Sequence, residues 1–130
     1  MKAFEPMRVV VKREVVDALL AAARALHPKE AILLLRGRRR GGSLVVEEVL
    51  IPPSATFGLG FASYNPFMLP LDPSIVGVAH SHPSGDPHPS VEDLNSGRGA
   101  LTMIAASPYR GTVDVHLYTA DGKELTYEVE

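Results

Sequence analysis

The 130-residue sequence contains no cysteine. Disulfide bonds, thiolate nucleophiles and cysteine-based metal sites are therefore excluded, as is the paired-cysteine zinc signature of the deaminases. No HExxH string occurs, which excludes the metalloproteases that are built on that motif. Every apolar run is also far shorter than the roughly 20 residues that a membrane-spanning helix needs.

An excess of charge of one sign is also lacking. Thirteen lysines and arginines stand against 15 acidic residues, for a net charge of -2, and 45% of the residues are hydrophobic. This balance gives no electrostatic reason to expect nucleic acid or an anionic membrane as a partner, and the apolar content is sufficient for a folded core. At the N-terminus, Glu5 and Pro6 interrupt any basic-then-apolar signal segment. We expect one domain over residues 1–130, cytoplasmic, as a monomer or homodimer.

The hydrophobic pattern predicts an α+β fold. Val15, Leu19, Ala22, Ala23 and Leu26 recur at three- and four-residue steps and predict a helix over residues 12–26. The expected strands cover residues 31–35, 44–51, 75–79, 112–119 and 124–128, with an arginine-rich hairpin loop at 36–42 and a second helix at 90–106. We expect a mixed, partly curled sheet flanked by these two helices. Residues 54–70 form a long loop, of a length that is more often functional than decorative.

The most informative segment is His80-Ser81-His82-Pro83, followed by Ser90 and Asp93. Histidines at positions i and i+2 of an extended chain place both imidazoles on one side of the backbone. Neutral imidazole is a preferred zinc ligand, and a catalytic zinc site needs three protein ligands with one position left open. Asp93, on the first turn of the expected second helix, is the third candidate ligand. The spacing therefore predicts a zinc site at His80, His82 and Asp93.

Hydrolysis also needs a proton acceptor and a donor to the developing oxyanion. Glu30 is the candidate base because it stands at the entry of an apolar strand, where a bare charge is costly, although an exposed position at the lip of that strand is the alternative. Ser90 is the candidate oxyanion donor. Ser90-x-x-Asp93 is also a variant capping box, a role compatible with presenting a ligand. The remaining histidines, His27, His88 and His116, are interpreted as structural or exposed.

The spacing His80-x-His82-x7-Ser90-x2-Asp93, with Glu30 upstream, resembles the JAMM motif of the MPN-plus metalloproteases. The segment from His27 to Gly37 also resembles the first helix-to-strand junction of that family, although Ile32-Leu33 stand where many members have Cys-Gly. The resemblance implies an MPN fold with zinc on His80, His82 and Asp93. It further implies Glu30 as general base and acid, and Ser90 as the residue that stabilises the tetrahedral intermediate.

The short chain leaves no room for the large insertions with which eukaryotic members of this family grip ubiquitin. The resemblance therefore implies a minimal prokaryotic-type isopeptidase or peptidase acting on ubiquitin-like modifiers or sulfur-carrier proteins that end in Gly-Gly. The alternative is a catalytically silent MPN scaffold, a class that typically loses the metal ligands. Two secondary hypotheses concern loops. The arginines at 36–40 form either a solvated hairpin or a contact for RNA or an acidic partner. The aromatic side chains of residues 54–70 either plug the core under the loop or line a groove for an extended peptide tail.

Overall fold

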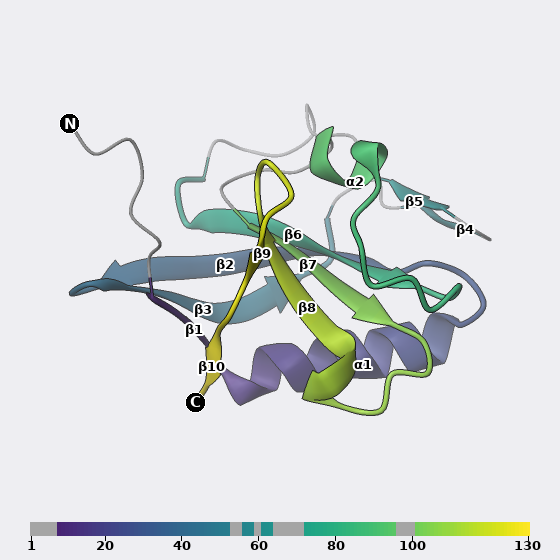
Figure 1. Ribbon diagram of the computed structural model, residues 1–130, viewed down its shortest axis with the longest axis horizontal. Helices are drawn as coiled ribbons and strands as arrows, with labels where there is room; N and C mark the ends of the chain where they lie inside the picture. Colours follow the sequence, from purple (N-terminus) through teal and green to yellow (C-terminus); the bar gives the residue numbers. More distant parts are fainter. Residues whose placement is uncertain (1–7, 53–55, 59–60, 64–71, 96–100) are drawn as a thin grey trace.

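The computed structural model describes residues 8–52, 56–58, 61–63, 72–95 and 101–130. Its centre is an eight-stranded mixed sheet in the order β10-β1-β3-β2-β6-β7-β8-β9 (Figure 1). The strands are β1 (Arg8–Val11), β2 (Ile32–Arg40), β3 (Ser43–Leu50), β6 (Ile75–His82), β7 (Leu101–Ala106), β8 (Val115–Thr119), β9 (Glu124–Leu125) and β10 (Glu128–Val129). Helix α1 (Arg13–Leu26) lies along one face of the sheet, whereas the short helix α2 (Val91–Asn95) lies on the opposite side.

The apolar stripe of α1 packs on the sheet as its spacing predicts. Val15, Leu19 and Ala23 are fully buried in a core that includes Leu35 and Met103. Removing a side chain of the size of leucine from water contributes about 1.5–3 kcal/mol. This face of the sheet is therefore the main source of stability, and it leaves the opposite face free to carry polar groups.

The opposite face has a smaller apolar cluster of Ile32, Leu34 and Val78. The two-stranded sheet of β4 (Thr56–Gly58) and β5 (Phe61–Ser63) lies beyond it (Figure 1). Both short strands fall within the long loop expected at residues 54–70. Tyr64 and Phe67, two aromatics of that loop, lie outside the described residues.

The sheet curls until its two ends approach each other. β9 and β10 occupy opposite ends of the strand order, yet only residues 126 and 127 separate them in the chain. Glu128 pairs with Val10 of β1, whereas Leu125 pairs with Leu117 of β8. A two-residue connection cannot cross a flat eight-stranded sheet, because strands lie about 4.8 Å apart. The curl expected from the sequence is therefore confirmed, whereas β1 is a strand that the sequence analysis did not assign.

The helix predicted over residues 90–106 is wrong in its extent. Only Val91–Asn95 is helical, and Leu101–Ala106 is strand β7, which runs parallel to β6. All six residues of β7 are buried, because β7 is a central strand covered on both faces. A short continuous apolar run does not distinguish a buried strand from a buried helix, so periodicity alone could not assign this segment.

The hairpin loop predicted at residues 36–42 is also shorter than expected. Strand β2 continues to Arg40, and Arg40 pairs with Ser43, so that the turn is Gly41-Gly42. Gly41 adopts a φ of 60°, a conformation that glycine reaches without a steric penalty. The arginines lie on the strand because acidic residues face them: Arg36 pairs with Glu48 at 3.0 Å and Arg38 with Glu47 at 3.1 Å.

Candidate active site

His80 and His82 project from the same face of β6, a central strand held by β2 on one side and β7 on the other. Ile32 pairs with His80, and Ala106 pairs with His82. The two imidazole side chains are only 1% and 11% exposed. Both rings thus lie on one side of a strand that is paired along both edges, as the i, i+2 spacing predicts.

The ring of His80 has an unusual environment. Both of its nitrogen atoms are buried and have no hydrogen-bond partner among the described residues. Burial lowers the pKa of His80, and the charge of Asp93 only partly opposes this effect. A neutral imidazole with a free lone pair is the form that binds a metal ion, whereas an unpartnered buried polar atom is otherwise costly.

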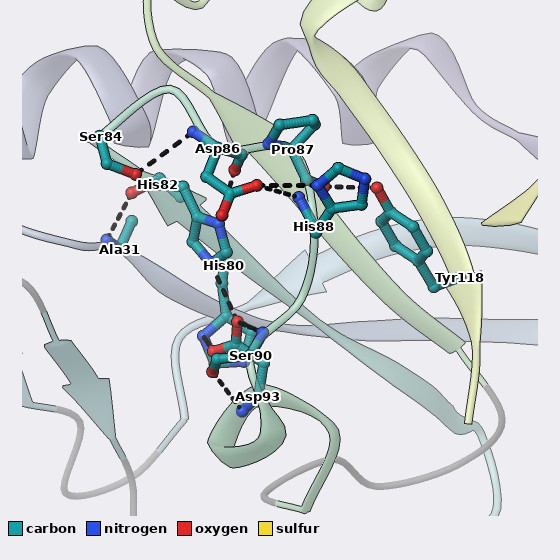
Figure 2. A network of polar contacts seen from close by, with 11 residues as sticks. Ala31, His80, His82, Ser84, Asp86, Pro87, His88, Ser90, Asp93 and Tyr118 are labelled. Atoms are coloured by element: carbon teal, nitrogen blue, oxygen red, sulfur yellow. Dashed lines mark hydrogen bonds and ion pairs between the residues drawn. The ribbon is translucent and has the colours of Figure 1, made fainter. Parts of the chain in front are cut away.

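Asp93 reaches both histidines from the first turn of α2. Its Oδ2 atom lies 2.9 Å from Nε2 of His82, and its Oδ1 atom lies 3.6 Å from Nδ1 of His80. The turn is held by a reciprocal cap, in which the Ser90 N–H donates to Asp93 Oδ2 at 2.8 Å and the Asp93 N–H donates to Ser90 Oγ at 3.0 Å. The predicted capping box is therefore present, and it fixes the carboxylate that faces the histidines (Figure 2).

These three side chains fit the demands of a zinc ion. Four ligands at 2.0–2.1 Å in a tetrahedral arrangement have donor atoms about 3.3 Å apart. The Asp93 carboxylate comes close to this distance from each histidine, with Oδ2 2.9 Å from His82 and Oδ1 3.6 Å from His80. Two imidazole nitrogens and one carboxylate are also a donor set typical of catalytic zinc sites. The unpartnered nitrogens of His80 are the strongest sign of a fit, because a metal ion would satisfy one of them.

Electrostatics favour the metal-binding charge state of Asp93, whereas in the absence of a metal ion they favour a protonated His82. The pKa of Asp93 is lowered to about 2, because hydrogen bonding to His82 and the neighbouring charges outweigh the effect of burial. Burial disfavours the charged form of His82. The hydrogen bonds to Asp93 and to the Asp86 carbonyl outweigh burial and raise its pKa. Asp93 is therefore ionised at neutral pH.

Glu30 lies just before β2 and faces the same cluster. One donor atom from each of Glu30, His82 and Asp93 lies within 4.8 Å of the others. Burial is the main cause that raises the pKa of Glu30, with the charge of His82 opposing it and that of Asp93 adding to it. The side chain is partly buried, so the reading of Glu30 as an exposed residue at the lip of the strand is wrong.

Backbone contacts fix the position of Glu30. Its N–H donates to the Gly58 carbonyl of β4 at 2.8 Å. The next residue, Ala31, donates its N–H to the Ser81 hydroxyl at 2.7 Å and accepts from the Ser81 N–H at 3.0 Å. Ser81 is fully buried and stands between the two histidines. Sequence reasoning assigned it no role, although it ties the segment of Glu30 to the strand of His80 and His82.

Ser90 opens onto the same space. Its hydroxyl oxygen accepts the Asp93 N–H, so its own hydrogen remains available for donation. The site is an open pocket of about 590 Å³. The lining residues are Glu30, His82, Pro83, Ser84, Asp86, His88, Pro89, Ser90, Glu92 and Asp93.

The other histidines do not join the metal donors. His27 is exposed and makes an edge-on contact with the ring of Tyr109. His116 pairs with Glu124 at 3.0 Å. His88 is exposed, but it lines the pocket and lies 2.9 Å from the carboxylate of Asp86. The prediction of structural or exposed roles is confirmed for all three, with the addition that His88 borders the pocket.

Comparison with known proteins agrees with this geometry. Residues 12–120 match the family described as prokaryotic homologs of the JAB domain. A probable metalloprotease of Haloferax volcanii is 37% identical over 99% of this chain and 84% of its own length. The chain belongs to the prokaryotic JAB family.

Solved structures of similar fold include a JAB1/MPN domain protein from Archaeoglobus fulgidus. It has 30% identity, a TM-score of 0.66, and coverage of 92% of this chain and 96% of that one. A second, described as a JAMM metalloprotease-like zinc site in the proteasome and signalosome, has 27% identity and a TM-score of 0.67. It covers 95% of this chain and 98% of its own. The MPN fold is thereby confirmed. Among the described residues, no helix is long and apolar enough to cross a membrane.

Proposed function

We propose that the protein is a zinc metalloprotease that hydrolyses amide bonds following a C-terminal Gly-Gly of ubiquitin-like or sulfur-carrier proteins. The convergence of His82 and Asp93 beside Glu30 in one pocket, with the buried His80 ring next to Asp93, carries this proposal. The similarity to a probable metalloprotease and to a JAMM metalloprotease-like zinc site supports the same class of chemistry.

His80, His82 and Asp93 would hold the zinc ion. When bound, zinc supplies Lewis acidity that polarises a carbonyl and makes water more acidic. The carboxylate of Glu30 takes the proton of the attacking water and delivers it to the leaving amine. Its raised pKa suits this exchange, because a group that both accepts and returns a proton works best with a pKa closer to the working pH.

The Ser90 hydroxyl donates a hydrogen bond to the oxygen that becomes negatively charged as the carbonyl is attacked. A donor held in place before the reaction needs no reorganisation when charge develops. The cap holds Ser90 in this way, because two hydrogen bonds join Ser90 to Asp93, which is itself a proposed metal ligand.

Strand β4 supports an extended substrate tail. The Gly58 carbonyl accepts a hydrogen bond from the N–H of Glu30, so β4 ends beside the proposed base. An extended peptide can add to the edge of such a hairpin through main-chain hydrogen bonds. We propose that the segment at residues 54–70 guides the tail in this way. Substituting Phe57 or Phe61 without any change in cleavage efficiency would count against it.

The test is cleavage of a small modifier linked through its C-terminal Gly-Gly to a reporter, by a peptide bond in one substrate and a lysine isopeptide bond in another. Wild type should cleave at least one of them, and a chelator should abolish cleavage. Glu30→Gln should keep its zinc but lose about 10²–10⁴-fold in kcat. Glu47→Gln is the matched control, because Glu47 pairs with Arg38 away from the pocket.

The substrate and the alternative of a silent scaffold are tested in the same assay. Replacing Gly-Gly by bulkier residues should reduce cleavage if the tail is recognised. Zinc binding without cleavage of either linkage would overturn the Gly-Gly substrate. Absence of both zinc and cleavage would favour a scaffold, although the retained donor set argues against that class.

A further inference from the structure

The orientation of His82 depends on a contact outside the metal donors. Its Nδ1 atom lies 2.8 Å from the carbonyl oxygen of Asp86. A carbonyl can only accept a hydrogen bond, so Nδ1 must carry a hydrogen. Nε2 faces the Asp93 carboxylate, which also only accepts, so a bound metal ion would take the place of the hydrogen on Nε2. Partners of this kind set which nitrogen a histidine offers to a metal ion.

The Asp86 carbonyl belongs to the loop of residues 83–89, which joins β6 to the cap of α2. Several hydrogen bonds close this loop on itself. The Gly85 N–H donates to the His82 carbonyl at 3.0 Å, and the Asp86 N–H donates to Ser84 Oγ at 3.2 Å. His88 bonds to the Asp86 carboxylate through its backbone N–H and its ring. These bonds shape the loop and attach its start to the last residue of β6, but none of them attaches it to β8.

Tyr118 supplies such an attachment from β8. Its side chain is 2% exposed, and its hydroxyl donates to the carbonyl of Pro87, next to Asp86 (Figure 2). Proline has no N–H, so this carbonyl is the only backbone group of Pro87 that can form a hydrogen bond. Burial, followed by the charges of Glu124 and Asp86, raises the pKa of Tyr118 and keeps the hydroxyl protonated as a donor.

The register explains why Tyr118 faces this loop. Leu117 belongs to the core beneath the sheet, so its neighbour Tyr118 points to the opposite face, as do His80 and His82. Tyr118 pairs with Thr102 of β7, and Thr102 pairs with Val78 of β6. The loop starts at the end of β6 and therefore passes over β7 before it reaches Tyr118 on β8.

We propose that Tyr118 is a positioning residue for the metal site. Its hydroxyl holds the peptide of Pro87 so that the adjacent Asp86 carbonyl keeps accepting from Nδ1 of His82, which leaves Nε2 aimed at the metal. This inference rests on the proposed zinc site but not on the proposed substrate. Two hydrogen bonds would then connect Tyr118 on β8 with His82 on β6, one to the carbonyl of Pro87 and one to the carbonyl of the neighbouring Asp86.

The test compares Tyr118→Phe with Tyr127→Phe. Tyr127 is a matched control, because its hydroxyl also donates to a backbone carbonyl, that of Val115, at 2.7 Å. The zinc Kd of each purified protein is measured by competition with a chelator of known affinity. Tyr118→Phe should raise the Kd about tenfold, the lower end of the range for groups that orient a metal ligand. Tyr127→Phe should leave it within about twofold of wild type.

A spectroscopic readout separates positioning from general destabilisation. In zinc-loaded protein labelled with ¹⁵N-histidine, the Nδ1–H of His82 should be visible and exchange slowly with water in wild type and Tyr127→Phe. In Tyr118→Phe it should exchange at least several-fold faster. Equal zinc Kd and equal exchange in wild type and Tyr118→Phe would overturn the inference, as would equal weakening in both variants.

Failure of this inference is distinguishable from failure of the proposed function. Zinc binding that responds to Tyr118→Phe, in a protein that cleaves no Gly-Gly conjugate, would leave the positioning role intact and reject only the substrate. A wild type that binds no zinc would overturn both.

Discussion

Nε2 of His82 and Oδ2 of Asp93 lie 2.9 Å apart, although the two residues stand on different elements and 11 positions apart in the chain. The intervening loop contains Pro83, Pro87 and Pro89, which limit its backbone freedom, and a capping box ends it. The chain thus brings a carboxylate back over the strand that carries the histidines. His80 and Glu30 both lie next to this pair.

Zinc should stabilise the fold through His80. At a free zinc concentration 100 times the Kd, binding adds about 2.7 kcal/mol to the free energy of unfolding, or about 10 °C in Tm for a chain of this size. His80→Ala should lose this zinc-dependent shift because it removes one of the proposed ligands. The measurement is thermal unfolding with and without zinc. His116→Ala is the control, since His116 pairs with Glu124 away from the site, and a zinc shift that persists in His80→Ala would contradict the assignment.

Ser90 should show separable effects on stability and catalysis. Alanine at a helix N-cap costs about 1 kcal/mol, whereas glycine costs only a few tenths. Both Ser90→Ala and Ser90→Gly remove the hydroxyl, so both should lower kcat by about 10²–10³-fold. Urea unfolding and steady-state kinetics measure the two quantities. If kcat fell in Ser90→Ala but stayed near the wild-type value in Ser90→Gly, as stability is expected to do, the hydroxyl would act only as a cap.

Ser81 should matter for Glu30 rather than for zinc. Ser81→Ala leaves the buried N–H of Ala31 without its acceptor, a loss of about 1–3 kcal/mol in the free energy of unfolding. Because Ala31 adjoins Glu30, kcat should fall while the zinc Kd stays within about twofold. Ser74→Ala serves as the control, since its hydroxyl bonds to Asp72 outside the pocket. An unchanged kcat in Ser81→Ala would place its role in folding alone.

Asp114 should make stability depend on acid pH. Hydrogen bonds from the side chain and backbone N–H of Arg110 lower the pKa of Asp114 to about 2. The folded-state pKa lies below the unfolded value, so the stabilisation is complete above about pH 4 and is lost as the pH falls toward 2. Wild type should therefore exceed Asp114→Asn in stability at pH 6, with a gap that narrows by pH 3.

Urea unfolding at the two pH values measures this gap. Asp17→Asn, at an exposed position of α1, is the control and should track wild type. A gap between wild type and Asp114→Asn that is the same at pH 6 and pH 3 would show that the ion pair with Arg110 does not set the acid dependence.

Local pattern was sufficient for much of the fold. The stripe that begins at Val15 identified α1, and the apolar runs identified β2, β3 and β6, because each segment carries its own period. Residues 101–106 are buried on both faces of the sheet, so they lack the alternation of apolar and polar residues that marks a strand. The sequence therefore predicted a helix there. Strand β1 was not assigned at all, and it exists as part of the sheet because β3 and β10 pair with it.

The sequence by itself determined which residue types stand at the proposed site, since His80, His82, Ser90 and Asp93 follow one another there at a spacing that predicts metal donors and a cap. Only the tertiary structure decided what lies around them. Glu30 reaches the pocket through the pairing of Ala31 with Ser81, and Tyr118 reaches the loop from β8. Neither contact has a signature in sequence spacing, because both depend on which strands the curled sheet places side by side.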